Sequence, residues 1–373
     1  MRASRAYNGK MSFARLIAAN IAILGLLLVI VEGLASYGLF LRSVMTTNTI
    51  AERRHTKYDA DLGWVNEPNV YIPDMYGPGV YLRTNAQGFR NNHDINTTVP
   101  DGKARVICSG DSFTLGYGVD NAHTWCELLS LQEPRLETVN MGQGGYGVDQ
   151  AYLWYKRDAA KIEHQLQLLA FITGDFFRML LDSAMGYPKP VLDVENGTLL
   201  VKNVPVARRA YYVPWLTQNI SHLTDLRTVQ FLNRAVQKIS GATIDPDLSI
   251  QRERKEKIRK VLRKMLEDLK HLHEQRSSAL VLVYFPSFHE LKYKDTREWT
   301  DLVEEESSSL GIPLITFFSE FQSLPANEIA NLFNPHHGHF SEAGNKFVAR
   351  IIHDKLMHHP AISHALSTRW NHR

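Results

Sequence analysis

The chain of 373 residues has few cysteines, little net charge and no excess of glycine or proline. Two cysteines, 23 glycines and 15 prolines exclude a disulfide-framework protein and a collagen-like chain. The 42 Lys and Arg against 39 Asp and Glu give a formal charge of +3, which argues against nucleic acid as a partner. Because 44% of the residues are hydrophobic, a disordered chain is excluded as well.

The hydrophobic residues are unevenly distributed. Residues 16–41 form a stretch of 26, of which 20 are hydrophobic, and a helix of this length would extend about 39 Å, enough to cross a bilayer. Its single acid, Glu32, lies near the outer end, and we expect an interfacial carboxylate without a specific role there. We therefore predict a transmembrane helix over residues 16–41, with the lipid bilayer as a partner.

The charges around this helix indicate its orientation. Residues 1–15 contain four basic residues and no acid, which favours a cytoplasmic tail. Residues 42–61 contain an equal number of basic residues, but only Arg42 lies close to the helix. A cleavable signal peptide is the alternative, because Gly33-Leu34-Ala35 resembles a cleavage site. The apolar run continues to Leu41, which favours an uncleaved anchor.

The remainder of the chain predicts an α/β domain. Residues 42–100 show little periodicity and are expected to be an extended lead-in across the domain surface. Short apolar runs then alternate with amphipathic stretches, which predicts a parallel sheet covered by helices on both faces. The expected strands are residues 104–109, 136–141, 166–172, 279–285 and 313–317, and the expected helices are residues 123–131, 148–164, 251–276, 296–310 and 341–357.

Two features interrupt or decorate this domain, which we place at residues 101–373. The alternation lapses over about residues 176–250, where Asn196-Gly197 between two alternating runs predicts a hairpin within an insertion. The charged helix over residues 251–276 is expected to be a solvated outer helix, and a surface facing anionic lipid is the alternative. Cys108 and Cys126 are most simply two buried thiols, although an oxidising exterior would permit them to pair.

Candidate catalytic residues lie at the two ends of the domain. Ser112 follows the first strand of the expected sheet, at the edge where open α/β sheets bind ligands. Thr114 stands where the nucleophile elbow of α/β-hydrolases has a glycine, so this is a different motif. His339 lies in a loop before the last long helix. An early serine and a late histidine at one sheet edge are the two groups that base-activated acyl transfer requires.

Several blocks of sequence resemble one family, the SGNH or GDSL hydrolases in their membrane-anchored bacterial form. The matching blocks are LGW at 62–64, NAQGFR at 85–90, GDSF at 110–113 and HFSEAG at 339–344. The resemblance covers the chain from about Asp61 onward. It implies a flavodoxin-like, three-layer α/β/α fold with an N-terminal transmembrane helix and a hairpin and helical insertion.

The resemblance also implies roles for individual residues. Ser112 would be the nucleophile and Gly145 would supply a second oxyanion N–H beside that of Ser112, while His339 would be the general base. The family's third oxyanion donor is an Asn, whereas Gly174 or Asp175 occupies its place here.

The family also has an Asp two or three residues before its histidine, where this chain has His337 and His336. Asp111, His336 and His337 are thus candidates for orienting or auxiliary roles. A backbone carbonyl can orient a histidine in place of a carboxylate, and the effects of such losses are not additive.

The glycines after the second strand and the histidines near His339 have two alternative interpretations, a dinucleotide-binding site and a zinc site. Gly142, Gly144 and Gly147 fit a dinucleotide-binding fingerprint in outline, but Asp175 lies 28 residues beyond Gly147, where about 20 is expected. His336, His337 and His339 are potential zinc ligands. No HExxH pattern or paired CxxC accompanies them, so we expect no metal and no cofactor.

The sequence thus predicts a single-pass protein of the bacterial inner membrane with its domain in the periplasm or outside the cell. We expect a serine esterase or O-acyltransferase that acts on O-acyl esters, above all O-acetyl, of a cell-surface or exported glycan. The small net charge suits a neutral sugar better than nucleic acid. The alternative is a protein of the same fold that has lost catalysis and binds glycan or serves assembly.

Overall fold

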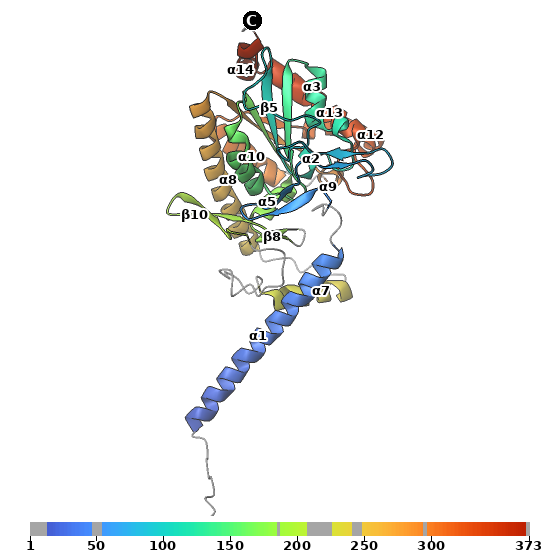
Figure 1. Cartoon of the computed structure of the whole chain (residues 1–373). Coiled ribbons are helices and arrows are strands. Elements are labelled where there is room, and N and C mark those ends of the chain that lie inside the picture. The colour runs from blue at the N-terminus through green and yellow to red at the C-terminus, as the bar shows by residue number, and fades with distance from the viewer. Residues whose placement is uncertain are drawn as a thin grey trace, which may run out of the picture. The chain divides into compact units, whose positions relative to one another are not determined.

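The structure is a computed structural model that describes residues 13–46, 54–184, 187–206, 226–240, 248–293 and 297–370. Its contacts divide the chain into two compact units (Figure 1). The first unit comprises Met1–Thr46 and Arg209–Pro246, and the second comprises Thr47–Arg208 and Asp247–Arg373.

Among its described residues, the first unit contains two helices that pack on one another, α1 (Phe13–Thr46) and α7 (Arg227–Ser240). The stretch Phe13–Leu39 of α1 is long and apolar enough to cross a membrane, a test that an anchor and a signal sequence both pass. Glu32 is buried, and its carboxylate accepts hydrogen bonds from the N–H groups of Arg227 (2.5 Å) and Thr228 (2.9 Å). It thereby caps α7, so the expectation that Glu32 has no specific role was wrong.

The second unit is built on a sheet of five parallel strands in the order β13-β12-β7-β5-β6. The strands are β5 (Ala104–Gly110), β6 (Leu136–Gly142), β7 (Leu166–Phe171), β12 (Ala279–Tyr284) and β13 (Leu314–Thr316). Along the chain this is the order 2-1-3-4-5 of flavodoxin-like sheets, whose switch point lies beside the first strand, β5. The predicted fold class is confirmed.

Helices cover both faces of the sheet (Figure 1). One face packs against α4 (Val148–Arg157), α8 (Leu248–Arg276) and α10 (Arg297–Leu310). The other packs against α3 (Trp125–Gln132), α13 (Glu342–His358) and α14 (Pro360–Trp370). Shorter helices connect these elements: α2 (Ser112–Leu115), α5 (Thr173–Met179), α9 (Phe288–Tyr293), α11 (Phe318–Gln322), α12 (Ala326–Asn331) and the 3₁₀ turns Asn121–His123 and Ala159–Lys161.

Four short antiparallel hairpins surround the sheet. They pair β1 (Thr56–Asp59) with β2 (Gly63–Asn66), β3 (Tyr71–Ile72) with β4 (Leu82–Arg83), β8 (Ser183–Ala184) with β9 (Tyr187–Pro188), and β10 (Val191–Glu195) with β11 (Thr198–Lys202). The last one turns at Asn196 and Gly197, with φ of 50° and 77°, as its sequence predicted. Within the lead-in, Trp64 and Phe89 are buried in the core, so this segment belongs to the domain interior.

A disulfide joins Cys108 at the end of β5 to Cys126 in α3. The interpretation of these residues as two separate thiols was therefore wrong. Both side chains are fully buried, and their Cα atoms are 6.1 Å apart. The sequence spacing of 18 residues gave no sign of this, because it is the packing of α3 on the sheet that brings them together.

Candidate functional site

Ser112 lies just beyond the end of β5, the strand between β7 and the edge strand β6. β5 ends at Gly110, and Ser112 is the first residue of α2. Asp111 caps this helix, because its carboxylate accepts a hydrogen bond of 2.9 Å from the N–H of Phe113. The turn therefore fixes the Ser112 hydroxyl at the carboxyl edge of the parallel sheet.

His339 meets Ser112 from the other end of the domain. Its Nε2 lies 2.7 Å from the Ser112 hydroxyl oxygen, although the two residues are 227 positions apart. The imidazole packs on the rings of Phe113 and Tyr117, at centroid distances of 4.9 and 4.8 Å. His339 immediately precedes the segment that enters α13, so the packing of α13 on the sheet places the ring.

His337 contacts the second ring nitrogen of His339, Nδ1. The two Nδ1 atoms are 3.0 Å apart, and the His337 ring packs edge-on against Tyr117. His336 is exposed, and its backbone N–H donates to the Asn334 side chain. Of the two histidines at the positions of the missing carboxylate, the structure brings His337 to the base and leaves His336 outside.

The hydrogen bonds that join Ser112, His339 and His337 require specific tautomers of the two histidines. For His339 Nε2 to accept the serine proton, its own proton must be on Nδ1, which then donates to Nδ1 of His337. Burial above all, together with the charges of His337 and Arg178, lowers the pKa of the His339 imidazole to about 3. Burial and His336 also lower the pKa of His337. Both rings are therefore neutral at neutral pH, as this arrangement requires.

The loop after β6 presents backbone donors beside the serine. Gly142 closes the gap between β6 and α2, because a Cβ there would lie 1.9 Å from the N of Leu115. Three residues later Gly145 adopts φ of 77°, a left-handed conformation that suits glycine. Within the described part of the chain, neither the N–H of Gly145 nor that of Ser112 donates to another residue. The two N–H groups are thus available to a substrate oxygen.

The lead-in holds that loop in place. The Trp64 indole donates to the Gly144 carbonyl (3.0 Å), and the Tyr146 hydroxyl donates to the Trp64 carbonyl. The Gln143 side chain donates to Asn66 (2.8 Å) and accepts from the N–H of Gly144 (2.8 Å). Strand β2, which precedes the sheet by about 40 residues of chain, is thereby a supporting element of the site.

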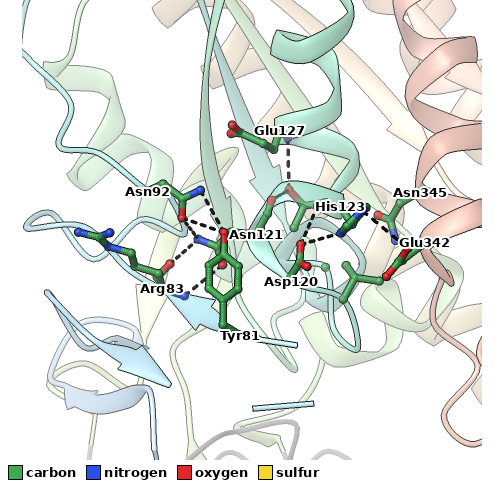
Figure 2. Close-up of polar contacts among 12 residues, drawn as sticks. Tyr81, Arg83, Asn92, Asp120, Asn121, His123, Glu127, Glu342 and Asn345 are labelled. Atoms are coloured by element: carbon green, nitrogen blue, oxygen red, sulfur yellow. Dashed lines mark hydrogen bonds and ion pairs between the residues drawn. The ribbon is translucent and has the colours of Figure 1, made fainter. Parts of the chain in front are cut away.

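A second polar network ties together the segments that carry Ser112 and His339 (Figure 2). The Asn121 side-chain oxygen accepts a hydrogen bond from the backbone N–H of Arg83 (3.1 Å). Its amide nitrogen donates to the Arg83 carbonyl (2.8 Å) and to the Asn92 side chain (3.1 Å). At the start of α13, Asn345 accepts a hydrogen bond from the N–H of Trp125 (3.0 Å). The lead-in, the segment after α2 and the N-terminal part of α13 are thus cross-linked by side chains (Figure 2).

The place of the third oxyanion donor contains two buried acids and an arginine. Asp175 in α5 is buried and pairs with Arg178, and Asp111 lies 3.8 Å from the same guanidinium. Burial raises the pKa of both carboxyls; Asp111 raises that of Asp175 further, while Arg178 lowers both. Both Asp175 oxygens accept protein donors, from Ile172 and Arg178, and Gly174 has no side chain. In this arrangement neither position presents a side-chain donor.

The geometry around Gly147 and His339 bears on the dinucleotide-binding and zinc-binding alternatives. Arg178 and Asp175 lie against Gly147, with Arg178 Cβ 3.1 Å from an ideal Cβ, so they fill the place beside α4 that a dinucleotide phosphate would need. Across the described residues, no three His, Cys, Asp or Glu side chains form a group suited to a metal ion. His339 uses both ring nitrogens, on Ser112 and His337.

Comparisons with known proteins give structural likenesses at low identity. No protein-family model and no curated protein matches the chain. A solved structure of a member of the lipolytic protein G-D-S-L family from Veillonella parvula DSM 2008 is similar at 13% identity and a TM-score of 0.40, covering 68% of this chain and 99% of its own. An acetyl-xylooligosaccharide esterase from Geobacillus Stearmophilus is similar at 12% identity and a TM-score of 0.36, with 68% and 94% covered.

Proposed function

We propose that this protein is a membrane-anchored serine esterase or O-acyltransferase that acts on O-acyl esters, above all O-acetyl, of an exported or cell-surface glycan. The observation that carries the proposal is the 2.7 Å contact between the Ser112 hydroxyl and Nε2 of a neutral His339, together with the N–H groups of Ser112 and Gly145, which have no acceptor among the described residues. A hydroxyl, a base and an oxyanion site are the parts that acyl transfer needs.

The steps follow from these positions. Ser112 Oγ attacks the ester carbonyl carbon while His339 Nε2 takes the hydroxyl proton, and the carbonyl electron pair moves to the oxygen. The resulting oxyanion accepts hydrogen bonds from the N–H groups of Ser112 and Gly145. His339 then gives its proton to the departing sugar oxygen, which leaves an acyl group on Ser112. Water or another sugar hydroxyl resolves this intermediate, with His339 as the base again.

His337 takes the place of the carboxylate that usually orients a catalytic histidine. As a neutral acceptor 3.0 Å from His339, it fixes the ring and its tautomer. It stabilises the imidazolium less than an anion would, because it carries no charge. We therefore assign His337 as a positioning residue, with His336 outside the proton path.

Three observations support the anchored, exported location. The apolar helix α1 follows a basic segment. Gly33 and Ala35, where a signal peptidase would cut, are buried in the first unit with the Glu32 cap of α7, which favours retention of the helix. The Cys108–Cys126 disulfide suits an oxidising compartment.

The glycan part of the proposal has a cavity to support it. The cavity measures about 570 Å³ and is lined mainly by polar residues of the lead-in: Asn69, Val70, Tyr71, Arg83, Thr84, Asn85, Asn92, His93 and Asp94. Amide, carboxylate and tyrosine groups suit the hydroxyls of a neutral sugar. The same cavity also favours the second candidate function, a non-catalytic protein that binds glycan.

The test compares the full chain in mild detergent with Ser112→Ala, His339→Gln and a Glu342→Gln control on the exposed start of α13. A short aryl acetate reports turnover, and acetate release from an acetylated oligosaccharide reports the substrate class. We expect Ser112→Ala and His339→Gln to lose at least about 10⁴-fold in kcat, while Glu342→Gln retains activity. If the natural chain is no faster than Ser112→Ala but binds the oligosaccharide, the binding function replaces the catalytic one.

A further inference from the structure

The guanidinium of Arg178 lies near Ser112, and three of its five N–H donors have no acceptor among the described residues. Its Nη1 donates to the Tyr146 carbonyl (3.1 Å), pairs with Asp175 and lies 3.8 Å from Asp111 Oδ2. Among the residues that the structure describes, Nη2 and Nε have no acceptor. The side chain is 19% exposed, so these donors are accessible to a ligand.

The position of this guanidinium is defined from two directions. Asp111 Oδ2 lies 3.4 Å from the Ser112 hydroxyl and 3.8 Å from Arg178 Nη1, so one carboxylate oxygen spans the distance between them. An ideal Cβ on Gly174 would lie 3.9 Å from Arg178 Nη2. A short side chain at position 174 could therefore reach the place that Arg178, four residues later on α5, now occupies.

Arg178 is held rather than mobile. Asp175 is itself fixed, since its second oxygen accepts the N–H of Ile172 at 3.1 Å. The Tyr146 carbonyl, which accepts from Arg178 Nη1, belongs to the residue directly after Gly145. One guanidinium nitrogen thus connects α5 to the Gly145 loop, and Nη2 and Nε have no acceptor among the described residues.

We propose that Arg178 donates a charge-assisted hydrogen bond to the oxyanion formed when Ser112 attacks an ester, as a third donor beside the N–H groups of Ser112 and Gly145. This inference rests on the proposed function. In that step the bond from Ser112 Oγ to the carbonyl carbon forms, the hydroxyl proton goes to His339, and the carbonyl oxygen receives the electron pair. Arg178 stabilises that negative oxygen without gaining or losing a proton.

The electrostatics fit a donor of this kind. A preorganised donor in a water-poor site acts where charge develops, and a fixed cation is stronger than a neutral amide. The positive charge also lowers the pKa of His339, which keeps the base neutral before reaction. When the imidazolium forms, the oxyanion forms with it, so the repulsion from Arg178 is offset in the same step.

A purely structural role for Arg178, as the partner of Asp175, is the alternative that the test must separate. Gly174 provides the means. An ideal Cβ there lies 3.5 Å from Ile172 Cδ1 and 3.9 Å from both Ile172 Cγ1 and Arg178 Nη2, which are ordinary contacts, and the φ of Gly174 is outside the left-handed region. An asparagine at 174 can therefore be introduced, and its amide would extend toward the place of the guanidinium.

The experiment measures kcat and KM for the aryl acetate in the full chain and in Arg178→Ala, Arg178→Lys, Gly174→Asn and the double variant Gly174→Asn/Arg178→Ala. Thermal melting confirms that each variant is folded. We expect Arg178→Ala to lose about 10²- to 10³-fold in kcat with little change in KM. Arg178→Lys should lose less, because it keeps the charge, and the double variant should regain at least tenfold over Arg178→Ala, because an amide donor replaces the guanidinium.

The inference is overturned if folded Arg178→Ala retains kcat within about threefold, since one lost donor should cost far more. It is also overturned if the loss in Arg178→Ala is not reduced by Gly174→Asn, because a partner of Asp175 cannot be replaced from position 174. A failure of the proposed function has a different signature, in which the natural chain is no faster than Ser112→Ala.

Discussion

Two acid–base pairs in the second unit differ in burial and in how many of their hydrogen-bond donors have acceptors. Lys189 and Asp149 are 2.6 Å apart, and both side chains are almost completely buried. Lys189 also donates to the carbonyls of Leu181 (3.2 Å) and Pro190 (2.8 Å), so its three N–H donors have three acceptors. Arg178 pairs with Asp175 through one nitrogen, and its other nitrogens have no acceptor in the part of the chain that the structure describes.

This difference indicates that the Lys189 pair stabilises the fold, whereas Arg178 can take part in the reaction. A buried cation whose donors are all satisfied has nothing left to offer a ligand, and its loss leaves a buried carboxylate unpaired. A partly exposed cation with free donors beside a nucleophile can stabilise charge that develops during a reaction. We therefore expect substitutions at the Lys189 pair to change stability, and substitutions around Ser112 to change turnover.

The largest effect is expected at the structural pair. Lys189→Met should destabilise the protein by about 3–5 kcal/mol, because Asp149 would remain buried without a cation. Thermal melting of the full chain measures this. The double variant Asp149→Asn/Lys189→Met should recover much of the loss, and the folded fraction of each should retain kcat. An unchanged melting temperature would show that this pair is not structural.

The next effect concerns the orientation of His339. His337→Ala removes the acceptor for the His339 Nδ1 proton, and we expect kcat to fall about 10²-fold, less than the ~10⁴ for a charged orienting acid. His337→Asn, which keeps an acceptor oxygen, should lose less. His336→Ala is the matched control and should have little effect. Equal losses in His336→Ala and His337→Ala would contradict the assignment of His337.

A smaller effect is expected from the support of the Gly145 loop. Trp64→Phe removes the indole hydrogen bond to Gly144 while keeping most of the aromatic packing, and we expect about a tenfold loss in kcat from a less well-held donor. Trp125→Phe is the control, because its buried indole N–H has no hydrogen-bond partner in the described structure. If both variants turn over equally, β2 does not support the site.

The smallest change is expected in the pH profile. His339 is active as the neutral ring, and its folded pKa of about 3 lies far below the ordinary 6.5. Catalysis by the neutral base should therefore persist as the pH falls from 7 to 5, and decline only toward pH 3 as the ring becomes protonated. The measurement is kcat/KM against pH over the range where the protein remains folded. An acidic limb near pH 6.5 would show that His339 is not shielded in this way.

Much of this domain could be predicted because its signals are periodic or local. Five apolar runs gave five strands, and the position of Ser112 after the first of them placed it at the correct edge of the sheet. His339 could be placed beside it because the last helix of such a domain returns to the same edge. Parallel strands leave few alternatives for where these ends meet.

The supporting residues could not be predicted in the same way. Trp64 and Asn66 lie on a four-residue strand, too short for a hydrophobic pattern, and they act through pairings that span 77 to 80 residues. The only sequence signal for Arg178 was its position three residues after Asp175, a spacing of ion pairs that is common on exposed helices. Glu32 read as an interfacial acid because its partners, at Arg227 and Thr228, lie almost 200 residues away.

The central claim is that Ser112 and His339 form a working nucleophile and base. The most direct measurement is to treat the full chain in mild detergent with a fluorophosphonate probe and to locate the label by peptide mass spectrometry. We expect one label, on Ser112, that disappears in Ser112→Ala and forms much more slowly in His339→Gln. An unlabelled natural chain, or a label that persists in Ser112→Ala, would contradict the claim.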